Sequence, residues 1–327
     1  MDKIAILGID VSKDFFDVSL MRDGKIVASG QFNNSSAGFK SLQSWLKKRK
    51  VSVTWSCMEA TGRYGDELAH FLYERGHQVS VVNPARIKRY MQSKLQRNKS
   101  DQLDARLIAD FCATQKPDLW SPPPLEIRQL QEMVRRLGAL KDERTRESNR
   151  LQSGLTSEAV KASIEDHIAF INQAIEKLMK DIDQLTKQHP KLREDRELLE
   201  SISGIGTITA VTILGELGDW SRFDQADQVV AYAGLSVQHR QSGTSIRGKP
   251  RLAKLGNSRL RSCLYFPALT SMRFNPIIRA LTERLNEKGK LQMQIVGAAM
   301  RKLLRLAFGV LKTRMPFDPD FGQIQTN

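Results

Sequence analysis

The feature that most constrains this fold is a run of seven apolar residues whose spacings alternate between four and three. They are Ile164, Ile168, Ile171, Ile175, Leu178, Ile182 and Leu185. This spacing places all seven side chains on one seam of a helix and predicts a coiled coil. An earlier stretch, 127–137, keeps the same spacing and then loses it at Lys141 and Arg144. An antiparallel hairpin or a contact between subunits would bury both seams.

The sequence before these helices predicts an α/β domain. Residues 3–32 form three apolar or alternating stretches, and from Ser35 to about Ala113 helical and strand patterns alternate. An antiparallel meander followed by alternating helices and strands is the element order of an RNase H-like domain. The run "KPDLWSPPP" closes the domain, because proline lacks a backbone donor and restricts its neighbours. We predict an RNase H-like domain at 1–122, a coiled-coil helical connector at 123–190 and a mainly helical C-terminal domain at 191–327.

The C-terminal domain is expected to bind phosphates. Two apolar helical runs flank Gly204 and Gly206, which is the pattern of a helix-hairpin-helix, although an ordinary corner between core helices would look the same. From Gln228 to Thr282 the sequence contains no carboxylate, whereas solvated surfaces normally mix both signs. The one-sided charge therefore predicts a nucleic-acid-binding surface. Its principal basic residues are Arg240, Arg247, Lys249, Arg251, Lys254, Arg259 and Arg261.

Overall composition agrees with a polyanionic partner. The chain has 51 Lys and Arg against 36 Asp and Glu, a net charge of +15, and nucleic acid is the commonest partner of such proteins. A soluble protein that is merely basic is the alternative. The three cysteines are widely spaced, and the sequence has neither a signal-peptide pattern nor 18 consecutive apolar residues. We therefore expect a cytoplasmic protein.

Four carboxylates in the first domain predict a metal site. Asp10 interrupts an apolar strand, Glu59 ends another, and Asp101 and Asp104 lie three residues apart on a predicted helix. Such hard oxygen ligands are what Mg²⁺ requires. Asp10 could instead hydrogen-bond a loop, Glu59 could cap a turn, and the pair on the helix could complement its dipole. The other carboxylates considered for the site are Asp14, Asp17 and Asp110.

A basic cluster surrounds the carboxylate pair on the predicted helix. Its members are Arg97, Lys99 and Arg106, and they would hold a polyanion beside the metal. The basic residues would then attract the nucleic acid, and the neighbouring carboxylates would bind the cation that acts on its phosphate.

Segments spread over nearly the whole chain resemble one known family. They include "GIDVSKDFFDV", "EATGRYG", "VNPARIK", "RNKSDQLDARLIADFC" and "AYAGLSVQHRQSGTSIRGKPRLAKLGNSRLR". In this order they resemble the DEDD transposases of the one-ten insertion-sequence family. These transposases are relatives of the Piv DNA invertase and are described as bridge-RNA-guided recombinases. The resemblance implies a RuvC-like first domain whose tetrad, Asp10, Glu59, Asp101 and Asp104, binds Mg²⁺. It also implies that Ser242, the serine of the "SGxxxRG" pattern, attacks DNA and becomes covalently linked to it.

The resemblance further implies the partners of such a recombinase. These are donor DNA, target DNA and a bridge RNA, with dimers assembling into a tetramer whose active site is shared between subunits, in the bacterial cytoplasm near the nucleoid. Without the resemblance, Ser242 would be interpreted as a turn residue, although its basic neighbours could neutralise a scissile phosphate. His239 has no identifiable acid with which to form a triad. The basic residues considered as RNA contacts are Lys141, Arg144, Arg301, Lys302 and Arg305.

Two other functions fit the sequence. A RuvC-like nuclease would hydrolyse junctions through two metal ions without using Ser242. A nucleic-acid-binding protein without catalysis would use the charge alone, although the complete tetrad argues against it.

Overall fold

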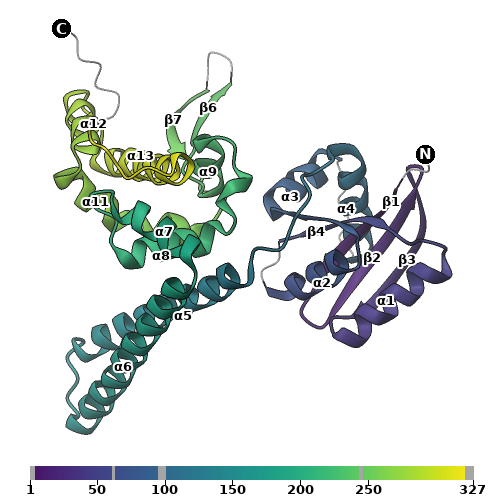
Figure 1. Ribbon diagram of the computed structural model, residues 1–327, viewed down its shortest axis with the longest axis horizontal. Coiled ribbons are helices and arrows are strands. Elements are labelled where there is room, and N and C mark those ends of the chain that lie inside the picture. The colour runs from purple at the N-terminus through teal and green to yellow at the C-terminus, as the bar shows by residue number, and fades with distance from the viewer. Residues whose placement is uncertain (1–3, 61–62, 95–100, 243–245, 321–327) are drawn as a thin grey trace. The chain divides into compact units, whose positions relative to one another are not determined.

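The computed structural model describes residues 4–60, 63–94, 101–242 and 246–320 (Figure 1). The chain divides into two compact units, Met1–Pro122 and Pro123–Asn327, and the division falls within the proline-rich run. None of the described helices combines the length and the apolar character that crossing a membrane requires.

The first unit is a five-stranded mixed sheet with helices on both faces (Figure 1). The strand order is β3-β2-β1-β4-β5, in which β2 is antiparallel to β1 and β3, and β4 is parallel to β1 and β5. This is the RNase H-like arrangement that the sequence predicted. The strands are β1 (Ala5–Val11), β2 (Phe15–Arg22), β3 (Lys25–Asn33), β4 (Thr54–Glu59) and β5 (Gln78–Val82). The helices are α1 (Ser36–Lys48), α2 (Arg63–Glu74), α3 (Pro84–Ser93) and α4 (Asp101–Gln115).

The two faces of this sheet bury different helices. Leu7 and Ile9 of β1 belong to a hydrophobic cluster with residues of α1 and α2. On the other face, Cys57 of β4 clusters with Ile87 of α3 and with residues of α4 such as Ile108. Alternation along β1 therefore separates the face that α1 and α2 cover from the face that α4 covers.

Local sequence signals set several element ends. Ser35 caps α1 by accepting a hydrogen bond from the Gly38 amide at 3.3 Å. The turn between β2 and β3 uses Gly24 with a φ of 76°, and Pro84 occupies the first turn of α3. Ser100 immediately precedes α4 in the sequence and is of a residue type that favours helix caps, but it lies outside the described residues.

The second unit is mainly helical. Helices α5 (Leu125–Leu151) and α6 (Glu158–Gln188) form an antiparallel hairpin, one of the two arrangements that the heptad pattern allowed (Figure 1). A two-stranded antiparallel sheet, β6 (Val237–Ser242) and β7 (Ile246–Leu252), interrupts the helices that follow, and no strand was predicted there. The remaining elements are α7 (Pro190–Glu200), α8 (Thr207–Leu217), η1 (Trp220–Arg222), α9 (Ala226–Tyr232), α10 (Ser258–Cys263), α11 (Tyr265–Phe274), α12 (Pro276–Glu287) and α13 (Gln292–Thr313).

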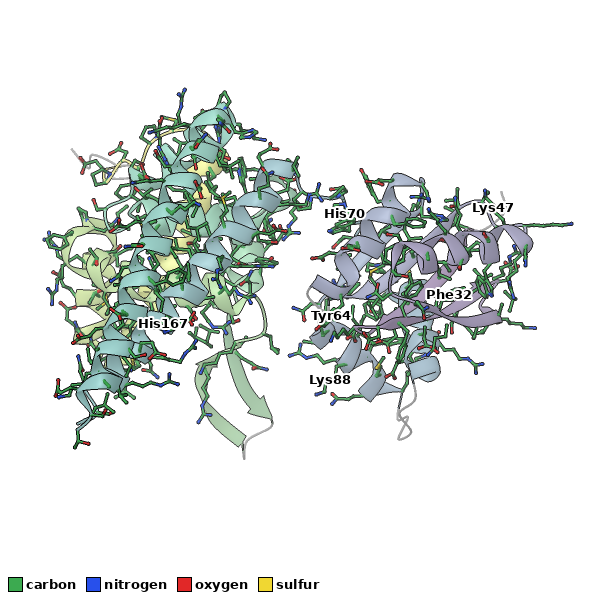
Figure 2. The ribbon with its side chains drawn as sticks, turned by 90° about the horizontal axis from the view of Figure 1, so that it is seen from below. Phe32, Lys47, Tyr64, His70, Lys88 and His167 are labelled. Carbon is green, nitrogen blue, oxygen red and sulfur yellow. The ribbon has the colours of Figure 1, made fainter. Side chains whose placement is uncertain are left out.

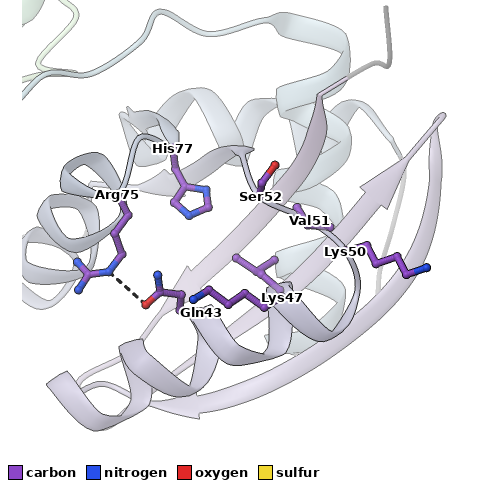
Figure 3. Close-up of a pocket in the computed structure, with 8 residues that line it drawn as sticks. Gln43, Lys47, Lys50, Val51, Ser52, Arg75 and His77 are labelled. Atoms are coloured by element: carbon purple, nitrogen blue, oxygen red, sulfur yellow. Dashed lines mark hydrogen bonds between the residues drawn. The ribbon is translucent and has the colours of Figure 1, made fainter.

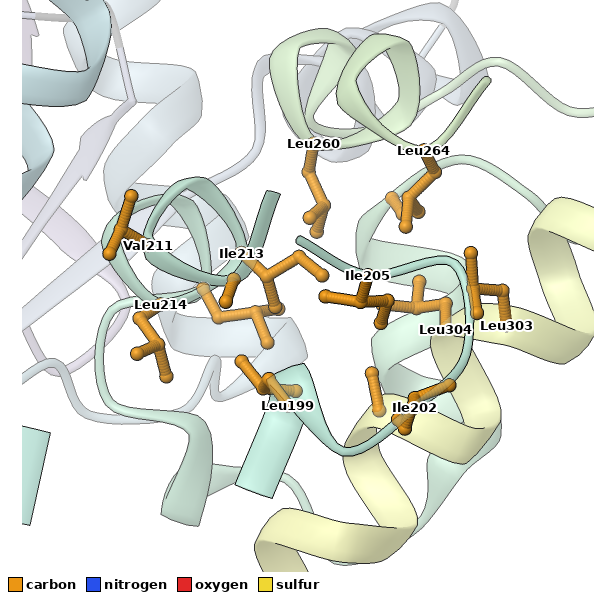
Figure 4. Packing of buried hydrophobic residues seen from close by; sticks show 14 of the residues in the cluster. Leu199, Ile202, Ile205, Val211, Ile213, Leu214, Leu260, Leu264, Leu303 and Leu304 are labelled. Atoms are coloured by element: carbon orange, nitrogen blue, oxygen red, sulfur yellow. The ribbon is translucent and has the colours of Figure 1, made fainter. Parts of the chain in front are cut away.

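One hydrophobic cluster runs through the second unit. It joins Leu130 and Ile182 of the hairpin to residues of the later helices. Figure 4 shows part of this cluster, including Leu214 and Leu304. The helices predicted as a connector therefore share a core with the C-terminal residues. Pro190 begins α7 inside this unit, so the proposed boundary at 190 is a change of helix within one core.

Where the heptad pattern fails, the hairpin makes polar contacts. Arg144 donates a hydrogen bond to Asn172 Oδ1 at 3.3 Å. His167 on α6 (Figure 2) lies 3.7 Å from a carboxylate oxygen of Glu143 and 3.9 Å from one of Glu147. At the interruption that suggested an RNA contact, Arg144 therefore has a hydrogen-bond partner on α6 within the protein.

Candidate active site

The carboxyl ends of the parallel strands form one rim of the first unit. Asp10 lies near the end of β1, and Glu59 is the last residue of β4. The side-chain amide of Asn34 donates to the backbone oxygens of Ser12 at 3.0 Å and Tyr64 at 2.9 Å, which ties three segments together at this rim. In open α/β sheets, ligands bind at this edge.

Helix α4 reaches the rim because β1 has glycine at position 8. A Cβ on Gly8 would lie 2.1 Å from the carbonyl oxygen of Ala105 and 2.4 Å from the amide nitrogen of Ala109. Only glycine allows the helix backbone to lie so close to the strand. Asp104 precedes Ala105 in α4, so this packing holds Asp104 beside the strand that carries Asp10.

Asp10, Glu59 and Asp104 interact electrostatically. Burial raises the pKa of Glu59 above its ordinary value, and the charges of Asp10 and Asp104 raise this pKa further. All three residues are partly buried. Asp101 lies in the first turn of α4, and its side chain, like Arg97 and Lys99, is outside the described part of the structure.

These carboxylates do not form a closed metal cage. Among the described side chains, no group of three or more Asp, Glu, His or Cys is arranged to hold a metal ion. The donors are nevertheless hard oxygens whose mutual repulsion a cation would relieve, and they stand at a rim where water and phosphate could complete its coordination. This donor set suits Mg²⁺ better than a thiolate- or imidazole-binding metal.

The other aspartates considered for the site have different surroundings. Asp110 accepts a hydrogen bond from Tyr90 at 2.7 Å and pairs with Lys94 at 3.0 Å. Burial alone would raise the pKa of Asp110, but these two contacts outweigh it and lower that pKa. Asp17 is buried and accepts a hydrogen bond from Gln31 at 3.1 Å, and Asp14 is exposed immediately before β2.

Arg86 on α3 was not among the predicted site residues. The pKa of Cys57 is raised, chiefly by a hydrogen bond to Cys112 and by burial, while the charge of Arg86 acts in the opposite direction. Arg86 is therefore near Cys57, two residues before Glu59 on β4. The segment "VNPARIK" contained the signal, because a proline-initiated helix after β5 projects its first turns at the same rim. Exposed Lys88 on α3 (Figure 2) adds positive charge, as does exposed Arg106 on α4.

Ser242 lies in the second unit, where the structure has a hairpin instead of the expected polar loop. It is the last residue of β6 and stands opposite Ile246 of β7 in the register. The side chains of Ser242, Arg240, Arg247 and Lys249 lie outside the described residues.

The described part of the basic segment separates exposed from structural residues. Arg251, Lys254 and Arg259 are exposed, and no described carboxylate lies within ion-pair distance of them. Arg261 is partly buried and donates a hydrogen bond to the Ala233 carbonyl at 2.9 Å. Arg261 therefore holds the end of α9, and the other three are the better candidates for phosphate contacts.

The predicted helix-hairpin-helix consists of α7, a short glycine turn and α8. Gly204 has a φ of 107°, and a Cβ on it would lie 2.0 Å from the Ser271 hydroxyl oxygen on α11. Gly206 precedes α8 in open space, and no side chain caps that helix. Close packing at Gly204 is what a core corner requires, and the open start of α8 is what phosphate binding requires, so both interpretations remain.

Two of the residues considered for RNA binding form ion pairs within the second unit. Arg301 and Arg305 lie 3.1 and 2.7 Å from the carboxylate oxygens of Asp227. Lys141 and Lys302 are partly buried. These contacts connect α13 to α9 and give the two arginines a structural role.

A shallow hollow of about 330 Å³ lies at the other edge of the first unit's sheet (Figure 3). Lys47, Lys50, Arg75 and His77 are among its lining residues, and they lie before β4 and β5 begin. Asp10, Glu59 and Asp104 do not line it, so the hollow is separate from these three carboxylates.

Comparison with known proteins gives matches in both units. Residues 7–159 match the profile of DEDD proteins described as "Transposase", and residues 196–283 match the profile "Transposase IS116/IS110/IS902 family". The pilin gene-inverting protein of Moraxella bovis is 34% identical over 315 residues, which cover 95% of this chain and 97% of that protein. The transposase for insertion sequence element IS1111A of Coxiella burnetii is 24% identical over 303 residues, or 84% and 79% of the two chains.

A search of solved structures found the RuvC protein of T. thermophilus in complex with a Holliday junction substrate. It is 15% identical with a TM-score of 0.25, and the match covers 35% of this chain and 96% of RuvC.

Proposed function

Because this chain belongs to the IS110 family of transposases, we propose that it recombines donor and target DNA through a covalent serine–DNA intermediate. The family establishes the class of enzyme, a DNA transposase or recombinase. The observation that supports the proposed chemistry is the electrostatic coupling of Asp10, Glu59 and Asp104 at the rim against which Gly8 admits α4.

We assign Mg²⁺ to Asp10, Glu59 and Asp104, with Asp101 as the fourth candidate. When bound, the cation would stabilise negative charge on a phosphate group. The carboxylates supply the anionic oxygens, and their mutual repulsion makes the site ready for a cation. Arg86, Lys88 and Arg106 would hold the phosphodiester backbone beside them.

Ser242 is the proposed nucleophile. Its hydroxyl oxygen attacks phosphorus and loses its proton, which forms a serine–phosphate bond. The bond between phosphorus and the oxygen of the leaving strand breaks, and that oxygen takes up a proton. A segment without carboxylates suits this step, because no fixed negative charge opposes the approach of a phosphate. The energy of the phosphodiester bond is retained in the serine–DNA linkage. Attack on this linkage by the free hydroxyl of another strand can therefore join DNA without an external energy source.

The partners follow from the family resemblance. A bridge RNA that pairs with donor and target DNA would provide sequence choice, while the protein contacts the backbones, as in other RNA-guided systems. Dimers would assemble into a tetramer whose active site is shared between subunits. The complex would act in the cytoplasm near the nucleoid.

The decisive experiment detects the covalent intermediate. Purified protein is incubated with Mg²⁺, bridge RNA and both DNA partners, and a denaturing gel is examined for a protein–DNA band. We expect the band with the wild type and with Asp110→Asn, whose aspartate is paired with Tyr90 and Lys94. We expect no band with Ser242→Ala, Asp10→Asn or Asp104→Asn.

Other outcomes favour the alternatives. If Ser242→Ala cleaves DNA at the wild-type rate, the protein is a metal-dependent nuclease. If the wild type binds DNA but neither cleaves it nor forms the band, the protein acts by binding alone.

A further inference from the structure

Helix α11 exposes two large aromatic side chains to solvent. Phe266 is 74% exposed and Phe274 is 69% exposed. Thr270 and Arg273 are also exposed, and spacings of four, seven and eight residues from Phe266 place all four on one side of the helix. The other side of α11 packs against α13. We call Phe266, Thr270, Arg273 and Phe274 the α11 face.

The α11 face lies in the segment that has no carboxylate, Gln228 to Thr282. Arg259 on α10 is exposed seven residues before Phe266. In the described part of the chain, neither Arg259 nor Arg273 has an acidic group within ion-pair distance. The aromatic rings therefore stand among positive charges that the protein does not neutralise locally.

The ring of Phe266 is oriented by its neighbour. Its centroid lies 5.3 Å from that of Tyr265, with 81° between the ring planes, which is a preferred edge-to-face geometry. Tyr265 is itself packed against the hydrophobic core of the unit. The contact holds Phe266 in place while most of its surface stays exposed, as a stacking platform requires.

We propose that the α11 face binds unpaired DNA, with Phe266 and Phe274 stacking on bases and Arg259 and Arg273 contacting phosphates. Base stacking on aromatic side chains tolerates any sequence, and basic neighbours follow the backbone. Duplex DNA presents no open base faces for such stacking. The inference rests on the proposed function for the source of this strand, because strand cleavage and exchange release unpaired DNA.

A second copy of the chain fits this face less well. Two identical faces in contact would bring the guanidinium groups of the two Arg273 side chains together without a carboxylate between them. Single-stranded DNA brings negative charge together with apolar base faces, and it therefore complements both features of the surface.

The test measures binding of the full-length protein to fluorescein-labelled oligonucleotides by fluorescence anisotropy. The probes are oligo-dT and oligo-rU of about 20 nucleotides and a duplex of the same length. The variant Phe266→Ala/Phe274→Ala removes both rings and no charge. Phe266→Tyr/Phe274→Tyr keeps both rings, and Phe170→Ala removes a ring that is 65% exposed on α6.

We expect the double alanine variant to bind oligo-dT at least about tenfold more weakly and the duplex within about twofold of the wild type, because two stacking contacts are lost. The tyrosine variant and Phe170→Ala should bind both probes like the wild type. Circular dichroism checks that each variant is folded.

Three results would overturn the proposal. The first is wild-type affinity of the double alanine variant for oligo-dT, and the second is a loss confined to oligo-rU, which would assign the face to RNA. The third is a change of oligomeric state in sedimentation velocity without a loss of DNA binding, which would assign the face to a subunit contact. Absence of the covalent band alongside the expected oligo-dT pattern would refute the proposed function alone.

Discussion

Arg135 on α5 and Glu216 on α8 form a bidentate ion pair inside the second unit. Arg135 donates to the two carboxylate oxygens of Glu216 at 2.9 and 3.3 Å, and the Glu216 side chain is only 1% exposed. Asn257 donates to the same carboxylate at 2.8 Å, and the Tyr232 hydroxyl donates to the Glu216 backbone oxygen at 3.1 Å. The network joins the helical hairpin to α8, α9 and the start of α10.

Loss of the Arg135 guanidinium group from this network should strongly destabilise the second unit. Arg135→Met would leave the Glu216 carboxylate buried without its charged partner, which costs about 3–5 kcal/mol in comparable pairs. Arg136→Met, at the exposed neighbouring position, should change stability by less than about 0.5 kcal/mol. Chemical denaturation of both variants measures the difference, and equal midpoints would show that the pair contributes nothing.

The contact between β1 and α4 gives a second prediction. Gly8→Ala would place a methyl group against the backbone of Ala105 and Ala109, so α4 must move away from the sheet. We expect a loss of about 1–3 kcal/mol or more, as for other overpacked sites, together with loss of DNA cleavage as Asp104 is displaced. In contrast, Gly138→Ala in α5 meets no atom within 4 Å and should stabilise its helix by about 0.5–1 kcal/mol. An active, fully stable Gly8→Ala protein would contradict this account of the site.

Burial of the Glu59 carboxylate, together with repulsion from Asp10 and Asp104, predicts a gain in stability when Glu59 is neutralised. The folded-state pKa of Glu59 is raised, so protonated Glu59 favours the folded state. This stabilisation is fully present below the unfolded pKa and is lost as pH rises through the folded pKa. At neutral pH without divalent metal, Glu59→Gln should therefore raise the Tm while abolishing cleavage. Added Mg²⁺ should raise the Tm of the wild type more than that of the variant.

Asp110→Asn is the matched control for this experiment. The pKa of Asp110 is lowered, so its charge stabilises the fold above its unfolded pKa, and the substitution should lower the Tm at neutral pH. A lower Tm for Glu59→Gln in the absence of metal would show that the folded protein does not disfavour the charged form of Glu59.

The sequence predicted the elements whose patterns are local. Period-two strands and the heptads of α6 follow from neighbouring residues. The candidate carboxylates Asp10 and Glu59 stood out because they interrupt or end apolar strands, yet only the packing at Gly8 explains how α4 reaches them. A glycine in a strand signals a close approach without naming the partner.

Tertiary contacts explain what the sequence did not predict. Strand β6 contains mostly polar residues, so it had no apolar periodicity. In β7 the basic residues do alternate with Ile246 and Leu252, but Gly248 and Pro250 between them weaken the strand signal. Arg259 and Arg261 are alike in sequence, but only Arg261 meets the Ala233 carbonyl. The partner of Arg301 and Arg305 is Asp227, more than 70 residues away in the chain.

His77 should make the stability of the first unit depend on pH. Its Nδ1 accepts a hydrogen bond from the Thr54 amide at 3.0 Å, which requires the neutral ring, and burial followed by the charge of Arg75 lowers the His77 pKa from 6.5. The stability from neutral His77 is present above 6.5 and is lost as pH falls below it. His77→Asn, which keeps an acceptor without a titrating ring, should flatten the dependence of Tm on pH between about 7.5 and 5.5. Parallel Tm curves for the two proteins would contradict this prediction.

The exposed basic residues after β7 should set the salt dependence of DNA binding. Arg251 and Lys254 are exposed, and no described carboxylate lies within ion-pair distance of them, so bound phosphates would release counterions there. Loss of two phosphate contacts lowers the slope of log affinity against log salt by about 1.8 for duplex DNA. We expect this change in Arg251→Glu/Lys254→Glu. Lys177→Glu/Lys180→Glu, an equal charge change at exposed positions of α6, should leave the slope nearly unaltered. Anisotropy titrations at several salt concentrations compare them, and equal slopes for the two double variants would show that net charge, not this surface, governs binding.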